Sequence, residues 1–143
     1  DSFKVGDHFS TWGANPVMCA AASATIDYIV ENKLWENAGK MGSLLLGRLK
    51  ELEDEYEVIG EARGLGLMVG VEIVKDKKSK RPGVEECAEI RRLCHEHGLI
   101  VGIGGFWLNV IRIQPPLTIM EEHVEEGMEA FEKAVREVDR KPR

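Results

Sequence analysis

Hydrophobic residues recur along this chain with two periods, one typical of helices and one typical of strands. Residues 1–14 follow neither period, and their Gly, Ser and Thr content predicts a loop. Asn15 and Pro16 predict a helix start, because Asn accepts a backbone N–H and Pro needs no donor there. Apolar residues then cover most of the circumference over residues 17–30, so we expect this helix to be buried on several sides.

A second helix is predicted between residues 34 and 56, where one apolar stripe lies against a charged face. The stripe consists of Leu34, Ala38, Met41, Leu45, Leu49, Leu52 and Tyr56. Gly39, Gly42 and Gly47 lower the helix propensity of the segment, so we expect close packing against a neighbour at these glycines.

Period-two alternation over residues 66–74 predicts a strand, and Val58-Ile59-Gly60 begins another strand before it. Arg63-Gly64-Leu65-Gly66 supplies glycines for a turn between them, so the segment predicts a β-hairpin. Shorter apolar stretches at residues 99–103 and 109–114 predict two further strands.

Two more helices are predicted around these later strands. One runs over residues 84–97, with Gly98 as a left-handed cap. The other begins at the capping box Thr118-Ile119-Met120-Glu121, after Pro115-Pro116 has ended the last strand. Their buried faces are Val84, Cys87, Ile90 and Cys94 in the first and Val124, Met128, Phe131, Val135 and Val138 in the second.

The order of elements is therefore loop, long helical region, two strands, helix, two strands and helix. Strands that pair as neighbours, with helices on one face, indicate the α+β class with two layers. The predicted architecture is an antiparallel sheet with helices on one face, preceded by a long bridging helix.

Composition narrows the functions open to such a fold. The chain has 143 residues and a formal net charge of −6, which disfavours nucleic acid or an anionic membrane as a partner. The dense cationic run at residues 76–81 ends at Pro82-Gly83 and predicts a solvated loop. Three cysteines without metal-ligand spacing favour a reducing compartment, and no secretory signal is evident, so we expect a cytoplasmic protein. Asp1 in place of Met indicates a chain cut from a longer one.

Most residue types associated with catalysis have a structural explanation in this sequence. The glycines of residues 102–105 do not complete G-x-G-x-x-G before a helix, so they predict turns or bulges instead of a nucleotide site. Cys19, Cys87 and Cys94 fall on apolar helix faces without an evident base beside them, which predicts small core residues. His8 stays open as a candidate because it lies in the unusual first loop.

Two candidate sites remain. Hydroxyls, a glycine and exposed N–H groups just before a helix, in residues 10–16, suit an oxyanion or a phosphate, with ordinary helix capping as the alternative. Arg112 is the second site, since Ile111 and Ile113 share one face of their strand and place the guanidinium on the other. Followed by a rigid Pro-Pro turn, it is suited to bind a carboxylate bidentately, with a structural salt bridge as the alternative.

Three segments carry a family resemblance. Residues 8–17 read His-Phe-Ser-Thr-Trp-Gly-Ala-Asn-Pro-Val, residues 63–72 read Arg-Gly-Leu-Gly-Leu-Met-Val-Gly-Val-Glu, and residues 109–117 read Asn-Val-Ile-Arg-Ile-Gln-Pro-Pro-Leu. In this order they resemble the H-x-x-T-x-G-G/A-N-P, R-G-x-G-L-M-x-G-x-E and N-x-[IL]-R-x-x-P-P-L motifs of class III aminotransferases. These are enzymes of fold type I that depend on pyridoxal 5'-phosphate (PLP), and the resemblance covers the C-terminal part of the family.

The resemblance implies a PLP enzyme that is active as a homodimer with a shared active site. Thr11 and Ser10 are then cofactor-binding residues, which hold the phosphate of PLP bound in the neighbouring subunit together with backbone N–H groups of their loop. Arg112 is then the substrate-binding residue, and its partner is a substrate carboxylate. Arg63 also matches a motif, but we expect it to be structural because a glycine-flanked turn needs anchoring.

The resemblance also implies a domain organisation. Residues 1–15 form an active-site loop from the large domain, residues 16–57 a bridging helical region, and residues 58–143 the small C-terminal α+β domain. In the isolated chain we expect residues 17–30 to expose an apolar surface, because their partners in the large domain are missing.

Transamination requires a lysine, which in this family lies upstream of Thr11. Lys4 is the only lysine before Thr11, and its neighbours Ser2-Phe3-Lys4-Val5-Gly6 lack the family context. We therefore expect no catalytic residue and no metal site in this chain, and no turnover by the chain alone.

The sequence Thr-Trp-Gly-Ala-Asn-Pro at residues 11–16 favours a 4-aminobutyrate-type aminotransferase, which moves an amino group from an amino acid to a 2-oxo acid. Ornithine or acetylornithine aminotransferase, glutamate-semialdehyde aminomutase and a PLP amino-acid racemase share the scaffold and remain alternatives. A further alternative is a non-catalytic module in which Arg112 binds a carboxylate without any cofactor.

Overall fold

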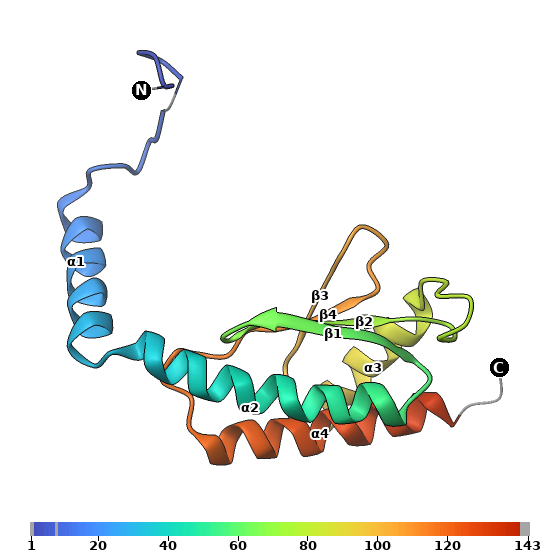
Figure 1. Ribbon diagram of the computed structural model, residues 1–143. Coiled ribbons are helices and arrows are strands. Elements are labelled where there is room, and N and C mark those ends of the chain that lie inside the picture. The colour runs from blue at the N-terminus through green and yellow to red at the C-terminus, as the bar shows by residue number, and fades with distance from the viewer. Residues whose placement is uncertain (1, 8, 141–143) are drawn as a thin grey trace. The chain divides into compact units, whose positions relative to one another are not determined.

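The computed structural model describes residues 2–7 and 9–140, which form four helices and four strands (Figure 1). In chain order they are α1 (Pro16–Glu31), α2 (Leu34–Glu55), β1 (Ile59–Leu65), β2 (Met68–Ile73), α3 (Val84–Glu96), β3 (Gly102–Gly104), β4 (Val110–Ile113) and α4 (Glu121–Asp139). The chain divides into two compact units, Asp1–Leu34 and Trp35–Arg143. Every predicted helix and strand therefore occurs, with bounds that differ by a few residues.

The first unit consists of a loop and helix α1. Asn15 caps the helix as predicted, because its Oδ1 accepts hydrogen bonds from the N–H groups of Val17 and Met18 at 3.0 and 3.4 Å. None of the α1 residues is buried, so this helix is not covered on several sides within the chain. Its apolar residues are exposed, as expected for the isolated chain, because the described residues of this unit form no second element to cover them. Cys19 is exposed for the same reason, and its predicted place in a core is wrong.

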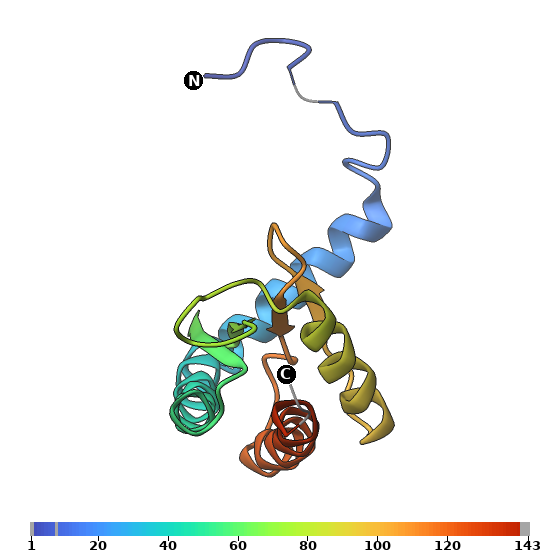
Figure 2. The same cartoon turned by 90° about the vertical axis from the view of Figure 1, so that its right-hand side faces the viewer.

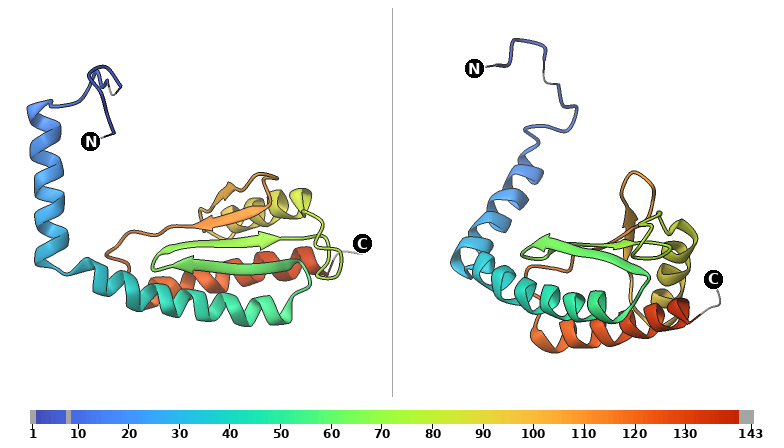
Figure 3. Two further views of the ribbon diagram at one scale, coloured as in Figure 1. Left: turned by 45° about the horizontal axis from the view of Figure 1, so that its top comes forward. Right: turned by 45° about the vertical axis from the view of Figure 1, so that its right-hand side comes forward.

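The second unit contains one antiparallel sheet with the strand order β1-β2-β4-β3. Helices α2, α3 and α4 all lie on the same face of this sheet (Figures 1 and 2). The predicted α+β class, with an antiparallel sheet and helices on one face, is confirmed. Within this unit no helix of the described part covers the opposite face, which we call the outer face (Figure 3).

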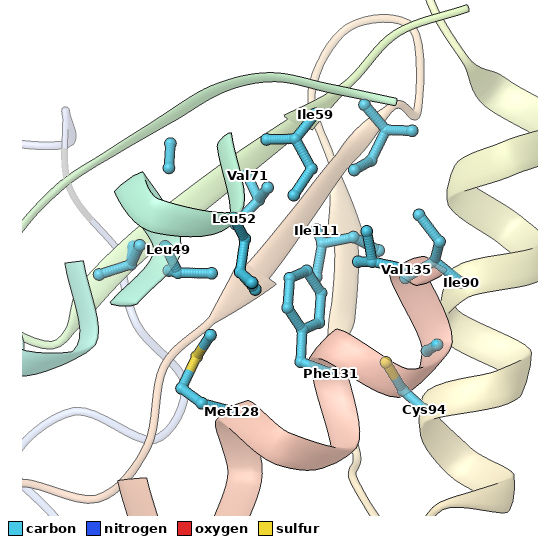
Figure 4. Packing of buried hydrophobic residues seen from close by; sticks show 14 of the residues in the cluster. Leu49, Leu52, Ile59, Val71, Ile90, Cys94, Ile111, Met128, Phe131 and Val135 are labelled. Carbon is cyan, nitrogen blue, oxygen red and sulfur yellow. The ribbon is translucent and has the colours of Figure 1, made fainter. Parts of the chain in front are cut away.

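The hydrophobic core lies between the sheet and its three helices. Phe131 of α4 is fully buried and points toward Ile111 of β4, and both lie near Val135 (Figure 4). The apolar stripe predicted for α4 is buried along its whole length. The α2 stripe is buried from Met41 to Tyr56. The two faces predicted from helical spacing therefore both contribute to the core beneath the sheet.

Helix α3 contributes two thiols to this core. Cys87 and Cys94 are buried as predicted, and burial raises the pKa of Cys87 to about 11 and that of Cys94 to about 12. Both side chains are therefore neutral and unreactive near pH 7. Val84 is 41% exposed, so its predicted burial is wrong, because the first turn of α3 extends past the core.

Only one of the three glycines in α2 makes the close contact that the sequence predicts. A Cβ at Gly42 would lie 2.2 Å from the carbonyl oxygen of Gly66, so the helix backbone touches the β1–β2 turn there. Gly66 itself has a φ of +53°, which favours glycine. A Cβ at Gly39 or Gly47 would meet nothing within 4 Å, so close packing does not explain those two glycines.

The bounds of the strands correct two predictions. Strand β1 continues through Leu65, so Arg63 and Gly64 belong to the strand and not to the turn. Strand β3 is Gly102–Gly104, so these glycines are strand residues and not turn or bulge residues. Since side chains alternate along a strand, glycines at 102 and 104 leave one face of β3 without side chains.

The capping box predicted for α4 is absent from the structure. The helix begins at Glu121 with Met120 at its N-cap and no hydrogen bond from a capping side chain. The preceding segment is held from a distance instead, because Asn37 Nδ2 donates to the carbonyl oxygens of Leu117 and Ile119 at 2.7 and 3.0 Å. This long-range contact replaces the local one.

The cationic run is exposed over residues 78–81, as predicted for a solvated loop. Within it, Lys77 Nζ donates to the carbonyl oxygen of Glu53 at the end of α2. A lysine near the C-terminus of a helix interacts favourably with the helix dipole. Just before the run, Lys75 Nζ lies 3.0 Å from a carboxylate oxygen of Glu86 in α3.

Carboxylates of the helices reach the edge of the sheet at β1. Glu53 Oε2 accepts a hydrogen bond from Ala62 N at 2.6 Å, and Asp139 Oδ1 accepts one from Val58 N at 2.9 Å. Burial raises the pKa of Glu53, but the hydrogen bonds from Lys50 and Ala62 outweigh it, and this pKa lies below its ordinary value.

Candidate functional site

A row of paired residues crosses the sheet in the order Arg63, Gly70, Arg112 and Gly102. Arg63 belongs to β1 and Arg112 to β4, and both are directed to the outer face. The prediction for the strand is confirmed at Ile111, which is fully buried on the opposite face. Two arginines on one face, separated by a glycine, thus define the candidate site.

Arg63 is engaged by carboxylates. Its Nη1 lies 2.7 Å from Glu61 Oε2 and 2.8 Å from Glu72 Oε2. The hydrogen bond to Glu72 is the chief cause that raises the pKa of Arg63, and Glu61 adds to it. These contacts are those of a structural arginine that joins β1 to β2, as the sequence leads us to expect.

Arg112 differs from Arg63 in its partners. Its side chain is exposed and makes no hydrogen bond or ion pair with any residue that the structure describes. The alternative, a structural salt bridge made by Arg112, therefore has no acidic partner among the described residues. An unpaired guanidinium keeps its planar set of N–H donors available for a carboxylate.

Asn109 anchors the strand that carries Arg112. This residue is only 4% exposed, and its Nδ2 donates to the carbonyl oxygen of Ile73 at 2.9 Å. The backbone of Ile73 also donates to the carbonyl oxygen of Asn109 at 2.7 Å. In the sequence Asn109 is a motif residue without an assigned role. A polar residue directly before an apolar strand is the feature that could have indicated this anchor.

The connection between β3 and β4 presents apolar side chains. Phe106, Trp107 and Leu108 are all exposed, and the Phe106 and Trp107 rings pack edge to face with centroids 4.9 Å apart. Gly105 and Leu108 both have positive φ, at 82° and 57°, which turns the chain back toward Arg112. No motif points to this apolar tip, although three consecutive large hydrophobic residues after two glycines are a signal in the sequence.

The second candidate site is the loop before α1, in the first unit. Ser10 Oγ accepts a hydrogen bond from Gly13 N at 2.9 Å, and Thr11 is exposed between them. Ala14 has a φ of 58°, so the loop turns sharply just before the Asn15 cap. His8 lies outside the described residues. The Thr11 hydroxyl is exposed within this turn, which is compatible with binding an oxyanion.

Two features are absent from the described residues. Among residues 2–7 and 9–140 no group of three or more His, Cys, Asp or Glu side chains is placed to hold a metal ion. Within the same part of the chain, no helix combines the length and the apolar character needed to span a membrane.

The fold and the motif residues point to one family. The chain matches the model of class-III aminotransferases over residues 1–135, and it belongs to that family.

Relatives of known name extend this finding. The chain is 44% identical over 132 residues to an alanine/serine racemase of Pyrococcus horikoshii, which covers 92% of this chain and 27% of the racemase. It is 40% identical over 133 residues to human mitochondrial alanine–glyoxylate aminotransferase 2, with 92% of this chain and 26% of the enzyme covered. Its structure is similar to a PLP-bound amine transaminase from an uncultivated Pseudomonas species, with a TM-score of 0.84, 32% identity, and 93% of this chain and 30% of that chain covered. The chain thus spans less than a third of the length of these relatives.

Proposed function

We propose that this chain is the C-terminal part of a PLP-dependent aminotransferase, in which Arg112 binds the carboxylate of the amino-acid or 2-oxo-acid substrate. The observation that carries this proposal is the exposed Arg112 guanidinium, which none of the described residues engages. A bidentate pair with a carboxylate satisfies two N–H donors at once and fixes the orientation of the substrate. Membership of the class-III family supports the same assignment.

Thr11 and Ser10 are the residues that we assign to the phosphate of PLP. Ser10 Oγ already accepts from Gly13 N, and its own proton stays available to a phosphate oxygen, as does that of the exposed Thr11 hydroxyl. When bound, PLP supplies the electron sink that amino-group transfer requires. We assign this loop to the site of a neighbouring subunit, so that the active protein is a cytoplasmic homodimer with shared active sites.

In this proposal Arg112 and the loop bind different molecules, the substrate and the cofactor. Arg112 binds and orients the substrate through its carboxylate, while the loop hydroxyls hold the cofactor phosphate. The chain supplies no catalytic lysine in our assignment, because Lys4 lacks the context of that residue. The proton transfer therefore falls to residues outside the chain.

From the loop sequence at residues 11–16 we assign 4-aminobutyrate as the amino donor, with ornithine or acetylornithine as alternatives. A racemase is the second candidate function, because the Pyrococcus horikoshii relative at 44% identity is an alanine/serine racemase. The two functions differ in a simple way. An aminotransferase needs a 2-oxo acid as acceptor, whereas a racemase inverts one amino acid without it.

The test uses the full-length protein loaded with PLP. Each of 4-aminobutyrate, ornithine, L-alanine and L-serine is incubated with and without 2-oxoglutarate or pyruvate, and the products are separated on a chiral column. New amino acid that forms only with the 2-oxo acid supports an aminotransferase, and D-amino acid formed without it supports the racemase. Binding of these acids to the cofactor-free protein, with no product in either case, would return the chain to a non-catalytic carboxylate-binding module.

The role of Arg112 has its own variant. Arg112→Lys keeps the charge but loses the bidentate geometry, so we expect the KM for a carboxylate substrate to rise about 10- to 100-fold. Arg63→Lys is the matched control, because it changes the same residue type in the same row of the sheet. Equal effects of the two substitutions on KM would contradict the assignment.

A further inference from the structure

We propose that Gly104 of β3 is a positioning residue for Arg112, because the absence of a side chain there lets the arginine side chain lie along β3 toward Gly102. This inference rests on the proposed function of Arg112 and assigns a residue that supports it. Gly104 acts through the Arg112 side chain and not through a contact of its own with substrate or cofactor.

The pairing of strands places the arginine over these glycines. Gly102 pairs directly with Arg112, and Gly104 pairs with Val110, the next outer-face position of β4. Ile103, between the two glycines, pairs with buried Ile111 and belongs to the core face. The outer face of β3 therefore offers a strip of bare backbone beside the arginine.

Distances show that the Arg112 side chain uses this strip. A Cβ at Gly104 would lie 2.9 Å from Arg112 Cδ and 3.2 Å from its Nε, which is too close for both to keep their places. A Cβ at Gly102 would lie 3.4 Å from Nη2 and 3.5 Å from Nε, which is ordinary contact. The side chain thus passes over Gly104 and brings its guanidinium near Gly102.

The opposite neighbour provides a contrast. Gly70 of β2 also pairs directly with Arg112, yet a Cβ there would meet only a methyl group of Val110, at 3.2 Å. No atom of Arg112 comes within 4 Å of that position. The arginine therefore leans toward β3 and away from β2, although both strands present glycine to it.

Backbone conformation does not explain the two glycines. Gly66, Gly98 and Gly105 have positive φ, whereas Gly102 and Gly104 do not. A glycine within a strand weakens it, because it adds conformational entropy to the unfolded chain and packs no side chain. Space for the neighbouring arginine is a physical reason for glycine at position 104, whereas a Cβ at position 102 would make only ordinary contact with it.

This arrangement orders Arg112 without neutralising it. Arg63 is held by two carboxylates that both bind its Nη1. A backbone strip restricts the arginine side chain by shape and leaves its donors free for a carboxylate. Restricting a side chain before binding lowers the entropy lost when the ligand binds.

The test compares Gly104→Ala, Gly102→Ala and Gly70→Ala in the full-length, PLP-loaded protein. We expect Gly104→Ala to raise the KM for a carboxylate substrate about tenfold with little change in kcat, because an alternative arginine rotamer must be used. Gly102→Ala and Gly70→Ala should change KM less than about threefold. A KM for Gly104→Ala that equals that of Gly70→Ala overturns the inference.

A double substitution separates positioning from a structural effect. If Gly104 acts through Arg112, then Arg112→Ala and the combination of Arg112→Ala with Gly104→Ala have the same KM. A further rise in KM in the combination contradicts the inference. If Gly104→Ala alone impairs folding, recovery of the thermal midpoint in the combination supports the contact, and no recovery overturns it.

The outcome for the proposed function is read separately. A KM unchanged by Arg112→Lys overturns the role of Arg112 in carboxylate binding, whatever the glycine variants do. A KM raised by Arg112→Lys, together with equal effects of Gly104→Ala and Gly70→Ala, overturns only the role of Gly104.

Discussion

The two halves of the outer face carry the same side chain in different settings. In the β1–β2 half, Arg63 binds two carboxylates through its Nη1. In the β4–β3 half, Arg112 lies beside glycines and has no partner among the described residues. Strand position and charge are thus alike for the two arginines. They differ in the residues beside them, which pair Arg63 and leave Arg112 without a partner among the described residues.

The largest expected effect comes from removing support beneath the Arg112 half. Ile111→Ala deletes a fully buried side chain next to Arg112, and truncations of this kind cost about 2–5 kcal/mol. Urea unfolding followed by circular dichroism should show a lower free energy of unfolding. Ile113→Ala, at a partly buried position of the same strand, is the control and should cost less. Equal losses in the two variants would contradict the core described for β4.

An intermediate effect is expected from making the two halves alike. Replacing Glu61 and Glu72 together by Gln leaves Arg63 with neutral neighbours and creates a second unpaired guanidinium. These ion pairs are partly exposed, so we expect a loss of no more than about 1 kcal/mol in the free energy of unfolding, and less at high salt. The measurement is urea unfolding at low and high salt. An unchanged KM for the carboxylate substrate is expected, and a large increase would place Arg63 in the site.

The smallest expected effect is a dependence on pH in the β1 half. Because the pKa of Glu53 is lower in the folded than in the unfolded state, its contribution to stability is present above the unfolded pKa. It is lost as the pH falls through the folded pKa. The difference in unfolding free energy between the protein and its Glu53→Gln variant should therefore shrink between about pH 5 and pH 3. A difference that stays constant over this range would show that Glu53 carries no pH dependence.

Much of this fold follows from local patterns, because the spacing of apolar residues fixes which face is buried. The period of two around Arg112 predicted its outward direction, and the spacing in α4 predicted its buried face. What the pattern did not predict depends on contacts distant in sequence. Asn37 binds carbonyl groups of residues 117 and 119, which replaces the predicted cap of α4. Likewise, apolar residues around α1 predicted burial, but the partners for that surface are not provided within its unit.

The candidate site also has a part that the local sequence predicts and a part that depends on contacts distant in sequence. A motif and a strand pattern were enough to single out Arg112, but its lack of a partner depends on β2 and β3. The glycines at 102 and 104 were predicted to form turns, since a sequence does not reveal that an arginine side chain from β4 lies over them. The position of Arg112 beside these glycines depends on the register between β3 and β4, which only the folded chain defines.

The carboxylates at the β1 edge have a consequence for self-association. An exposed edge strand offers free N–H groups to any other extended chain and so invites intermolecular sheet formation. Here the amides of Ala62 and Val58 are already bound by Glu53 and Asp139 from the helices below. The helices thus do more than fill the core, because their carboxylates occupy two amides that this edge would otherwise offer to another chain.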